Sequence, residues 1–373
     1  MNGIKFFGTI KNEIIDLVRF YIKARYVKGA GPQLISAGLF LLTLCVGINF
    51  AGWLNIQTSW IDFNGSISSA ETPTILLYFG LTLILIGSFW IIRMEHNLHK
   101  QTKIENDRKV ALVVQIDAYS NVVTTPLKSS LPEEIKGKAI SIIIEKRDAL
   151  IGGNNLQEVS DEIINIEHML RQHARGHDLA DISISAGGLA PVPFLFLLGN
   201  VLEDERPIHW AEWNRVDSQW TWSSEGESIN LWGLPAATNL TSDEVVLKSG
   251  ITYPILDIDI STAFPNLSVL EWEPSDKIFQ RIVNEQSCND ICNEFKSLMV
   301  RLKGQGVRRV HFLLACSSAL TMRLGSVLCP RNMPETIIYQ YEKNSELIYT
   351  WGLVIKVNEG KKSVFVIDRR SIR

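Results

Sequence analysis

The sequence is poor in the features that mark an enzyme or a secreted protein. Its 373 residues include only five cysteines, and Cys288 and Cys292, one helical turn apart, have no nearby histidine or cysteine to complete a metal set. No Walker A loop, GxSxG elbow or HExxH motif occurs. The 37 basic and 40 acidic side chains nearly balance, so there is no broad basic field for a long nucleic acid. We therefore predict reduced cysteines, no catalytic centre, no resident metal or cofactor, and no long nucleic acid as partner.

Charged side chains are also missing from two long apolar runs, residues 34–54 and 74–92. A helix rises about 1.5 Å per residue, so each run matches a hydrocarbon core about 30 Å thick. We predict two transmembrane helices. The alternative is a buried helical hairpin in a soluble domain, but core helices seldom stay apolar on every face for this length.

The charges around these runs predict their orientation. Six Lys or Arg residues precede the first run and three follow the second within residues 93–103, whereas residues 55–73 contain none. By the positive-inside rule, both termini are cytoplasmic and the short loop is extracytoplasmic. Residues 94–109 are polar and read as a linker or a helix that continues from the second span.

The first 31 residues interleave apolar and basic side chains at near-helical spacing. This pattern is typical of a basic amphipathic helix at an anionic membrane surface, and equally of a helix that packs against the cytosolic domain. The sequence leaves both alternatives open.

Residues 110–373 contain a diverged internal repeat in the order strand, helix, strand, small-residue turn, helix, strand. In the first copy these are residues 110–120, a helix from Ser160 to about Gly176, 181–186, Gly187 with Gly188, 194–202 and 208–213. In the second they are 252–261, a helix from Ser275 to about Gly304, 309–315, 316–318, 320–328 and 336–341. The fold class is thus predicted as a membrane α-hairpin joined to a cytosolic α/β domain of two Rossmann-like lobes, about 110–240 and 241–373.

In parallel sheets, ligands lie beyond the carboxyl ends of the strands, where backbone amides at the next helix can receive phosphate. Two lobes related by a pseudo-twofold axis would pool two such edges, a geometry that suits several phosphates arranged in a ring. The candidate ligand-binding residues are Gln115, Asp117, Tyr119, Ser120, Ala186, Gly187 and Gly188 in the first lobe, and Asp259, Ser261, Thr262, Ser317 and Ser318 in the second. For each, an ordinary turn, helix cap or surface side chain remains an open alternative.

Five tryptophans lie between the candidate edges of the two lobes: Trp210, Trp213, Trp220, Trp222 and Trp232. They read either as a base-stacking wall or protomer interface, or as core and inter-lobe packing. We expect packing for most of them.

Residues 307–341, VRRVHFLLACSSALTMRLGSVLCPRNMPETIIYQY, resemble the C-terminal signature of SAVED domains, with a strand, a small-residue turn, a helix with an internal glycine, and an aromatic-rich strand. The resemblance covers roughly residue 110 to the C-terminus. It implies a fused pair of CARF-like lobes that binds a cyclic di-, tri- or tetranucleotide. In bacterial CBASS anti-phage systems, such messengers come from a cGAS-like nucleotidyltransferase.

With its two apolar runs, the chain resembles a two-transmembrane SAVED effector of the bacterial inner membrane. The resemblance implies messenger-driven homo-oligomerisation, rearrangement of the spans and permeabilisation of the lipid bilayer. The alternative function is a membrane-anchored, nucleotide-sensing regulator or scaffold without pore activity. A ring nuclease that degrades the messenger is a further alternative, which the absence of a catalytic motif disfavours.

Overall fold

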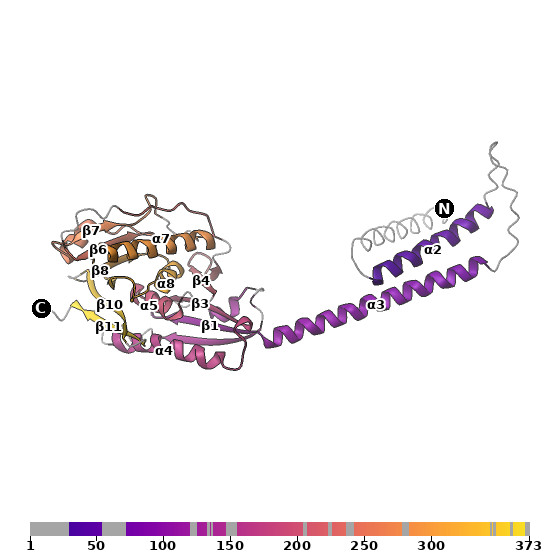
Figure 1. The fold of residues 1–373 in the computed structure, drawn as a ribbon, viewed down its shortest axis with the longest axis horizontal. Helices are drawn as coiled ribbons and strands as arrows, with labels where there is room; N and C mark the ends of the chain where they lie inside the picture. Colours follow the sequence, from indigo (N-terminus) through magenta and orange to yellow (C-terminus); the bar gives the residue numbers. More distant parts are fainter. Residues whose placement is uncertain are drawn as a thin grey trace, which may run out of the picture. The chain divides into compact units, whose positions relative to one another are not determined.

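The computed structural model describes residues 30–53, 72–119, 125–132, 135, 137–146, 155–203, 207–222, 226–235, 242–277, 283–343, 345, 348–358 and 361–369. The chain forms two compact units, Met1–Glu105 and Asn106–Arg373 (Figure 1). The predicted amphipathic segment, most of the predicted extracytoplasmic loop, and Ser120 lie outside the described residues.

The first unit contains helix α2 (Ala30–Trp53) and helix α3 (Thr72–Arg108). Both predicted spans are therefore helical. Among the described residues, only Leu77–Arg108 of α3 is long and apolar enough to cross a membrane. Gly31–Thr43 of α2 is a shorter apolar helix. Helix α3 continues without a break through the predicted linker and ends two residues before the first strand of the second unit.

Helices α2 and α3 pack against each other through glycines spaced seven residues apart on each helix. A Cβ atom added to Gly38 would lie 2.5 Å from the Gly80 carbonyl oxygen, and one added to Gly87 would lie 2.8 Å from the Gly31 carbonyl oxygen. Small residues at such positions let two backbones approach closely, which is how helices associate in membranes. The contact defines an antiparallel hairpin.

The second unit begins with a five-stranded sheet in the order β2-β1-β3-β4-β5. Strands β1 to β4 run parallel, and β5 is antiparallel to β4 at the edge. The strands are β1 (Val110–Asp117), β2 (Lys138–Glu145), β3 (Ile182–Leu189), β4 (Ile208–Asn214) and β5 (Gln219–Trp222). The helices are η1 (Leu127–Ser130), α4 (Leu156–Ala174), η2 (Leu179–Asp181) and α5 (Val192–Leu202).

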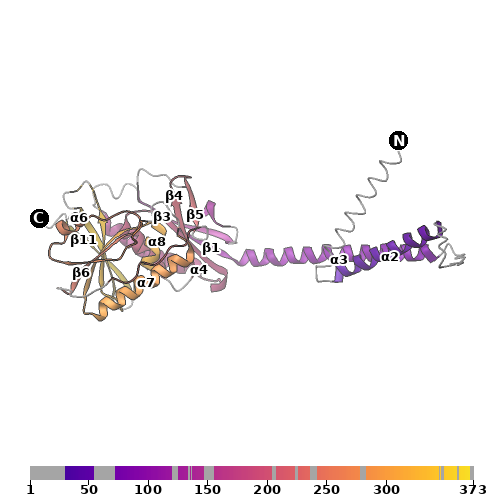
Figure 2. The same ribbon diagram turned by 90° about the horizontal axis from the view of Figure 1, so that it is seen from above.

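A six-stranded sheet follows, in the order β11-β10-β9-β8-β6-β7. Strands β6 to β9 are parallel, and β10 and β11 add antiparallel strands beside β9. The strands are β6 (Glu244–Gly250), β7 (Ser268–Glu271), β8 (Arg309–Ala315), β9 (Glu335–Tyr341), β10 (Tyr349–Asn358) and β11 (Lys361–Asp368). The helices are α6 (Asp257–Ala263), α7 (Glu285–Gly304) and α8 (Ser318–Ser326) (Figure 2).

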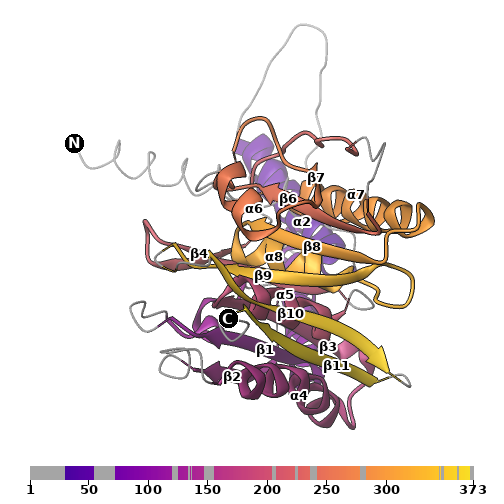
Figure 3. The same ribbon diagram turned by 90° about the vertical axis from the view of Figure 1, so that its left-hand side faces the viewer.

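The two sheets repeat one pattern, since the order β2-β1-β3-β4 in the first matches β7-β6-β8-β9 in the second. The equivalent helices α5 and α8 pack against each other, and each also contacts the sheet of the other lobe (Figure 3). A Cβ atom on Gly199 would lie 1.8 Å from the Met322 carbonyl oxygen, and one on Gly325 would lie 2.0 Å from that of Phe196. Only glycine fits at this crossing, and a single hydrophobic core joins the lobes.

Several predicted elements are wrong in position. Residues 252–261 are not a strand, because the first strand of lobe 2 is β6 and residues 257–263 form α6. The alternation of Ile and Asp in this stretch is the pattern expected of a half-buried strand, which led to the wrong prediction. In α6, Ile258 is exposed and Asp259 is buried. The repeat also contains one more strand than predicted, β2 in lobe 1 and β7 in lobe 2.

The predicted starts of two helices are also wrong. Helix α4 begins at Leu156, and Ser160 lies inside it with its hydroxyl donating to the Leu156 carbonyl at 2.8 Å. Helix α7 begins at Glu285, where the Asn284 side chain accepts from the Ser287 N–H at 2.8 Å, rather than at Ser275. A capping asparagine offers the same acceptor as a serine, so the local pattern did not discriminate between them.

Candidate functional site

The carboxyl end of β1 lies where the sequence predicted, but its polar residues are buried. The Gln115 side chain donates to Asp117 Oδ2 at 2.7 Å and accepts from the Leu127 N–H at 2.7 Å. Burial raises the pKa of the Tyr119 hydroxyl to about 12. These side chains therefore join β1 to the η1 turn and pack the lobe.

Gly187 and Gly188 are not in a turn, contrary to prediction, because β3 continues through Ala186, which was predicted as strand, to Leu189. A Cβ atom on Gly188 would lie 2.4 Å from the Ile116 side chain, and one on Gly187 would lie 3.1 Å from the Trp220 ring. The small residues thus let β3 lie close to β1 and beneath a tryptophan, inside the buried sheet.

Asp259, Ser261 and Thr262 lie on α6 and not at a strand end, which corrects the prediction. The hydroxyls of Ser261 and Thr262 donate to the Ile258 carbonyl at 3.0 and 2.7 Å, as is common within helices. The Tyr341 hydroxyl, from the end of β9, donates to Asp259 Oδ2 at 3.5 Å. Asp259 is therefore linked to the carboxyl edge of the second sheet through its hydrogen bond with Tyr341.

Ser317 and Ser318 lie at the predicted place, between β8 and α8. Ser317 is the N-cap of α8, and its hydroxyl accepts from the Leu320 N–H at 3.4 Å. The alternative of a helix cap is thus confirmed for Ser317. The amino end of α8 also places the backbone N–H groups of Ser318 and Ala319 at the edge of the sheet.

These amino-end donors of α8 are taken by a carboxylate from the other lobe, Glu212 on β4. One carboxylate oxygen accepts from the Ser318 N–H at 3.2 Å and the Ser318 hydroxyl at 2.9 Å, and the second accepts from the Ala319 N–H at 2.8 Å. Loss of solvent raises the pKa of the Glu212 carboxyl above its ordinary value, although the hydrogen bonds oppose this shift. Sequence reasoning missed Glu212.

Gln340 on β9 makes the reciprocal contact. Its side-chain oxygen accepts from the Val192 N–H, at the amino end of α5, at 3.1 Å. In the repeat, strand 208–213 aligns with strand 336–341, so Glu212 and Gln340 are equivalent positions. Each lobe therefore extends one side chain across to the helix terminus of the other, and the alignment of the two strands is the sequence signal that could have found the pair.

The tryptophans mostly pack, as expected. Trp210, Trp213, Trp220 and Trp222 are buried. Two of them also satisfy their indole N–H groups internally, Trp220 with the Thr125 carbonyl at 2.7 Å and Trp222 with the Ser130 carbonyl at 3.1 Å. Because these four rings are buried, they have no free face on which a nucleobase can stack.

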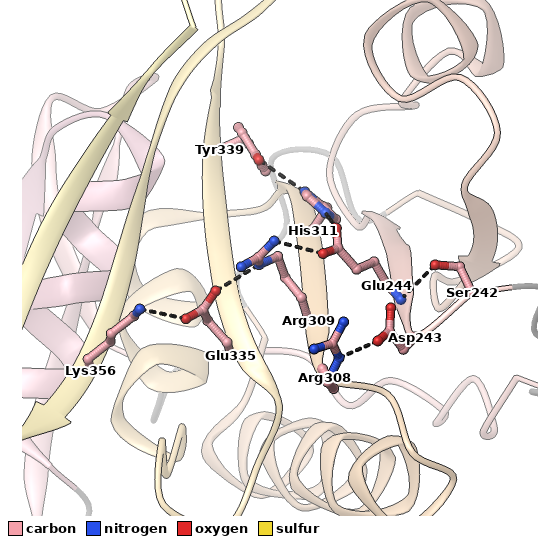
Figure 4. A network of polar contacts seen from close by, with 9 residues as sticks. All are labelled: Ser242, Asp243, Glu244, Arg308, Arg309, His311, Glu335, Tyr339 and Lys356. Atoms are coloured by element: carbon pink, nitrogen blue, oxygen red, sulfur yellow. Dashed lines mark hydrogen bonds and ion pairs between the residues drawn. The ribbon is translucent and has the colours of Figure 1, made fainter.

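A second polar cluster lies at the opposite, amino end of β6, β8 and β9. Glu244 bonds His311 at 3.1 Å and Arg309 at 2.7 Å, and Arg309 bonds Glu335 at 2.7 Å (Figure 4). Figure 4 also draws Ser242, Asp243, Arg308, Tyr339 and Lys356 around them. Burial lowers the pKa of the His311 imidazole, against the raising effect of Glu244. Because the cluster is internally paired and far along the strands from their carboxyl ends, we assign it to stability.

A surface cavity of about 820 Å³ follows the carboxyl end of β7, lined among others by Trp232, Glu271 and Glu273. Its carboxylates make it a poor place for phosphate, because like charges repel.

The described residues also contain no candidate metal site. No group of three or more His, Cys, Asp or Glu side chains among them is arranged to hold a metal ion. Four cysteines outside the hairpin are free thiols: Cys288, Cys292, Cys316 and Cys329.

The fold defines a class of protein: an α/β domain of two mixed sheets that are joined through helices α5 and α8, preceded in the chain by an apolar helical hairpin. Two family models match the chain. The SAVED model, "SMODS-associated and fused to various effectors sensor domain", matches residues 162–355, and the "SAVED-fused 2TM effector domain" model matches residues 6–159. The protein belongs to the SAVED family and carries the two-transmembrane effector type of fusion.

Solved structures similar to the chain include the Acinetobacter baumannii Cap4 SAVED/CARF-domain receptor with 3′3′3′-cAAA, at 15% identity over 83% of this chain and 75% of that chain, with a TM-score of 0.42. The same receptor with 2′3′3′-cAAA matches at 14% identity over 83% and 75%, with a TM-score of 0.43. The Moraxella osloensis Cap4 receptor matches at 15% identity over 62% and 47%, with a TM-score of 0.38. No curated protein matches the chain significantly.

Proposed function

We propose that this protein is a receptor for a cyclic oligonucleotide in anti-phage defence, and that messenger binding to the second unit switches on the helical hairpin as a membrane effector. One observation carries the proposal: a SAVED sensor match and a SAVED-fused 2TM effector match lie in tandem on one chain. The Acinetobacter baumannii Cap4 SAVED/CARF receptor structures contain cyclic trinucleotides, and a messenger of that class is consistent with the proposal.

The messenger site, in this proposal, is the edge where the carboxyl ends of both parallel sheets meet around the amino ends of α5 and α8. Among the sequence candidates, Ser317, Ser318 and, through Tyr341, Asp259 lie there. Tyr341 is 43% exposed and offers a ring on which a base can stack. Gln115, Asp117 and the β3 glycines are more deeply buried, so their contribution is to support this edge from within.

Activation requires that the messenger bind the assembled state more tightly than the resting one, because equal affinity shifts nothing. We propose homo-oligomerisation of the sensor units, followed by rearrangement of inner-membrane hairpins whose termini both lie in the cytoplasm. A cGAS-like nucleotidyltransferase would supply the messenger.

A membrane-anchored regulator without pore activity is the second candidate, and the hairpin supplies the observation that favours it. The hydroxyls of Thr43 and Thr82 donate to carbonyls of their own helices, Thr43 to Phe40 at 2.8 Å and Thr82 to Tyr78 at 2.7 Å. Two of the polar groups available to line a pore are therefore satisfied within the helix. Exchange of the spans for an unrelated hairpin retains toxicity under this second function and abolishes it under the first.

The test is leakage of a small dye from liposomes that carry the full-length protein, with cyclic di-, tri- and tetranucleotides added one at a time. We expect one messenger to cause leakage and higher-order assembly. Tyr341→Ala should weaken the response, because it removes the exposed ring on which a base can stack, whereas Ser297→Ala on the exposed face of α7 serves as the control. Binding without leakage would support the regulator, and no binding by any member of the panel would refute the receptor.

A further inference from the structure

The amino ends of α5 and α8 are the two places where this type of fold offers backbone N–H groups to phosphate. In this protein both are closed, and by different means. At α8, the Glu212 carboxylate takes the Ser318 and Ala319 N–H groups and the Ser318 hydroxyl, while the Ser317 hydroxyl takes the Leu320 N–H. All four of these donors at the amino end of α8 therefore have an acceptor. For three of them the acceptor is the Glu212 carboxylate, which carries a negative charge.

At α5 the donors are largely missing. The helix begins after Pro191 and has Pro193 at its second position, so neither residue contributes an N–H. The Phe194 and Leu195 N–H groups turn back to the Pro191 carbonyl at 3.0 and 3.2 Å. Only the Val192 N–H remains, and the neutral Gln340 amide oxygen accepts from it.

The two closures are equivalent in the repeat but unequal in charge. Glu212 and Gln340 occupy matching positions on β4 and β9, and each crosses to the other lobe. A carboxylate at a helix amino end is favourable for the helix, since it complements the helix dipole. It also occupies, with the same sign of charge, the place that a phosphate oxygen would take.

We propose that Glu212 is a specificity-determining residue of the messenger site: it withholds the amino end of α8 from phosphate, so that the messenger's phosphates lie away from the pseudo-twofold axis. Because Glu212 is charged and its equivalent Gln340 is neutral, the two lobes present different surfaces at the messenger site. A cyclic oligonucleotide would therefore bind in one orientation. This inference rests on the proposed function for the identity of the ligand, but the closure of α8 to anions is a property of the chain itself.

Inorganic phosphate tests the closure without any messenger. Wild-type protein should show no thermal stabilisation by phosphate at concentrations at which Glu212→Ala, which frees three donors around Ser318 and Ala319, is stabilised in a saturable way. Equal stabilisation of both proteins would overturn the proposal. Glu167→Gln, which removes a carboxylate on α4 that pairs with Arg171, is the control for a general charge effect.

Messenger affinity tests the charge asymmetry. Glu212→Gln keeps one acceptor oxygen and removes the charge, so it should tighten messenger binding; one unit charge acting across several ångströms at an intermediate dielectric corresponds to about fivefold or more. Gln340→Glu adds a carboxylate to the other half and should weaken binding by a similar factor. A purely structural cap would change the melting temperature and leave both affinities equal to wild type, which contradicts the proposal. If no cyclic oligonucleotide binds the wild type, the proposed function fails, while the phosphate result still decides the closure.

Discussion

At the scale of single residues, the protein gives buried polar side chains hydrogen-bond partners, and His311 is the clearest case. Its two ring nitrogens face Glu244 at 3.1 Å and the Tyr339 hydroxyl at 3.0 Å, with Arg309 and Arg369 as nearby positive charges. Burial lowers the pKa of the imidazole, so the folded state favours neutral His311. None of this was visible in the sequence, because the partners come from β6 and β9, distant in the chain.

The lowered pKa predicts a pH dependence of stability. A group whose pKa is lower in the folded state stabilises the fold above its unfolded pKa, about 6.5 for histidine, and loses that contribution as pH falls. Wild type should therefore lose stability below about pH 6.5 more steeply than His311→Gln, which cannot be protonated. Chemical denaturation between pH 8 and pH 5 checks this, with His177→Gln, an exposed histidine after α4, as control. Parallel pH profiles for wild type and His311→Gln would contradict it.

At the scale of elements, glycine spacing decides how the hairpin packs. The structure places Gly38, Gly80 and Gly87, together with Gly31, at the contact between α2 and α3. The backbones of the two helices therefore lie closer together than larger side chains at these four positions would allow.

Gly38→Val should separate the two helices, because the added side chain meets the Gly80 carbonyl and the Ile84 side chain. We expect faster hydrogen exchange of α2 and α3 amides in detergent-solubilised, full-length protein. Leu85→Val is the matched control, since Leu85 is 70% exposed on the opposite face of α3. Unchanged exchange for Gly38→Val would show that the hairpin does not depend on this contact.

At the scale of the whole second unit, the lobes are held by one crossing of α5 and α8 and by reciprocal side chains that span it. The crossing is built on Gly199 and Gly325, and Asn200 donates to the Gly325 and Leu328 carbonyls at 3.1 and 2.8 Å. Because each helix also contacts the other lobe's sheet, the relative position of the two candidate edges is set here.

Gly199→Ala should therefore destabilise the protein more than an ordinary helical substitution. Its Cβ atom would lie within 1.8 Å of the Met322 carbonyl oxygen, and overpacking of a core typically costs about 1 to 3 kcal/mol, or more where backbone must move. Gly304→Ala, at the end of α7 with open space around it, should be neutral or stabilise by up to about 1 kcal/mol. Urea unfolding of full-length protein distinguishes them, and a Gly199→Ala variant as stable as wild type would refute the close crossing.

The sequence by itself determined the parts of this protein that depend on local pattern. Uninterrupted apolar runs predicted the helices α2 and α3, and the strands β1, β3, β4, β8 and β9 and the helices α5 and α8 follow from short apolar segments bounded by turns. The repeat of these segments was enough to predict two matching lobes. A helix cap was one of the two alternatives that the sequence left open for Ser317, and a cap can be foreseen locally because a serine before a helix acts through its nearest neighbours.

Only the tertiary structure decided what lies at the candidate edge. Residues 257–263 alternate like a strand yet form a helix. Gly187 and Gly188 look like a turn yet lie in β3, where Gly187 is close to Trp220 and Gly188 is close to Ile116, because contacts with distant residues override local preference. Glu212 reaches Ser318 across 106 positions of sequence. The residues next to Glu212 in the sequence give no sign that its carboxylate accepts hydrogen bonds at the amino end of a helix in the other lobe. The two sites are close only because the two sheets pack around α5 and α8.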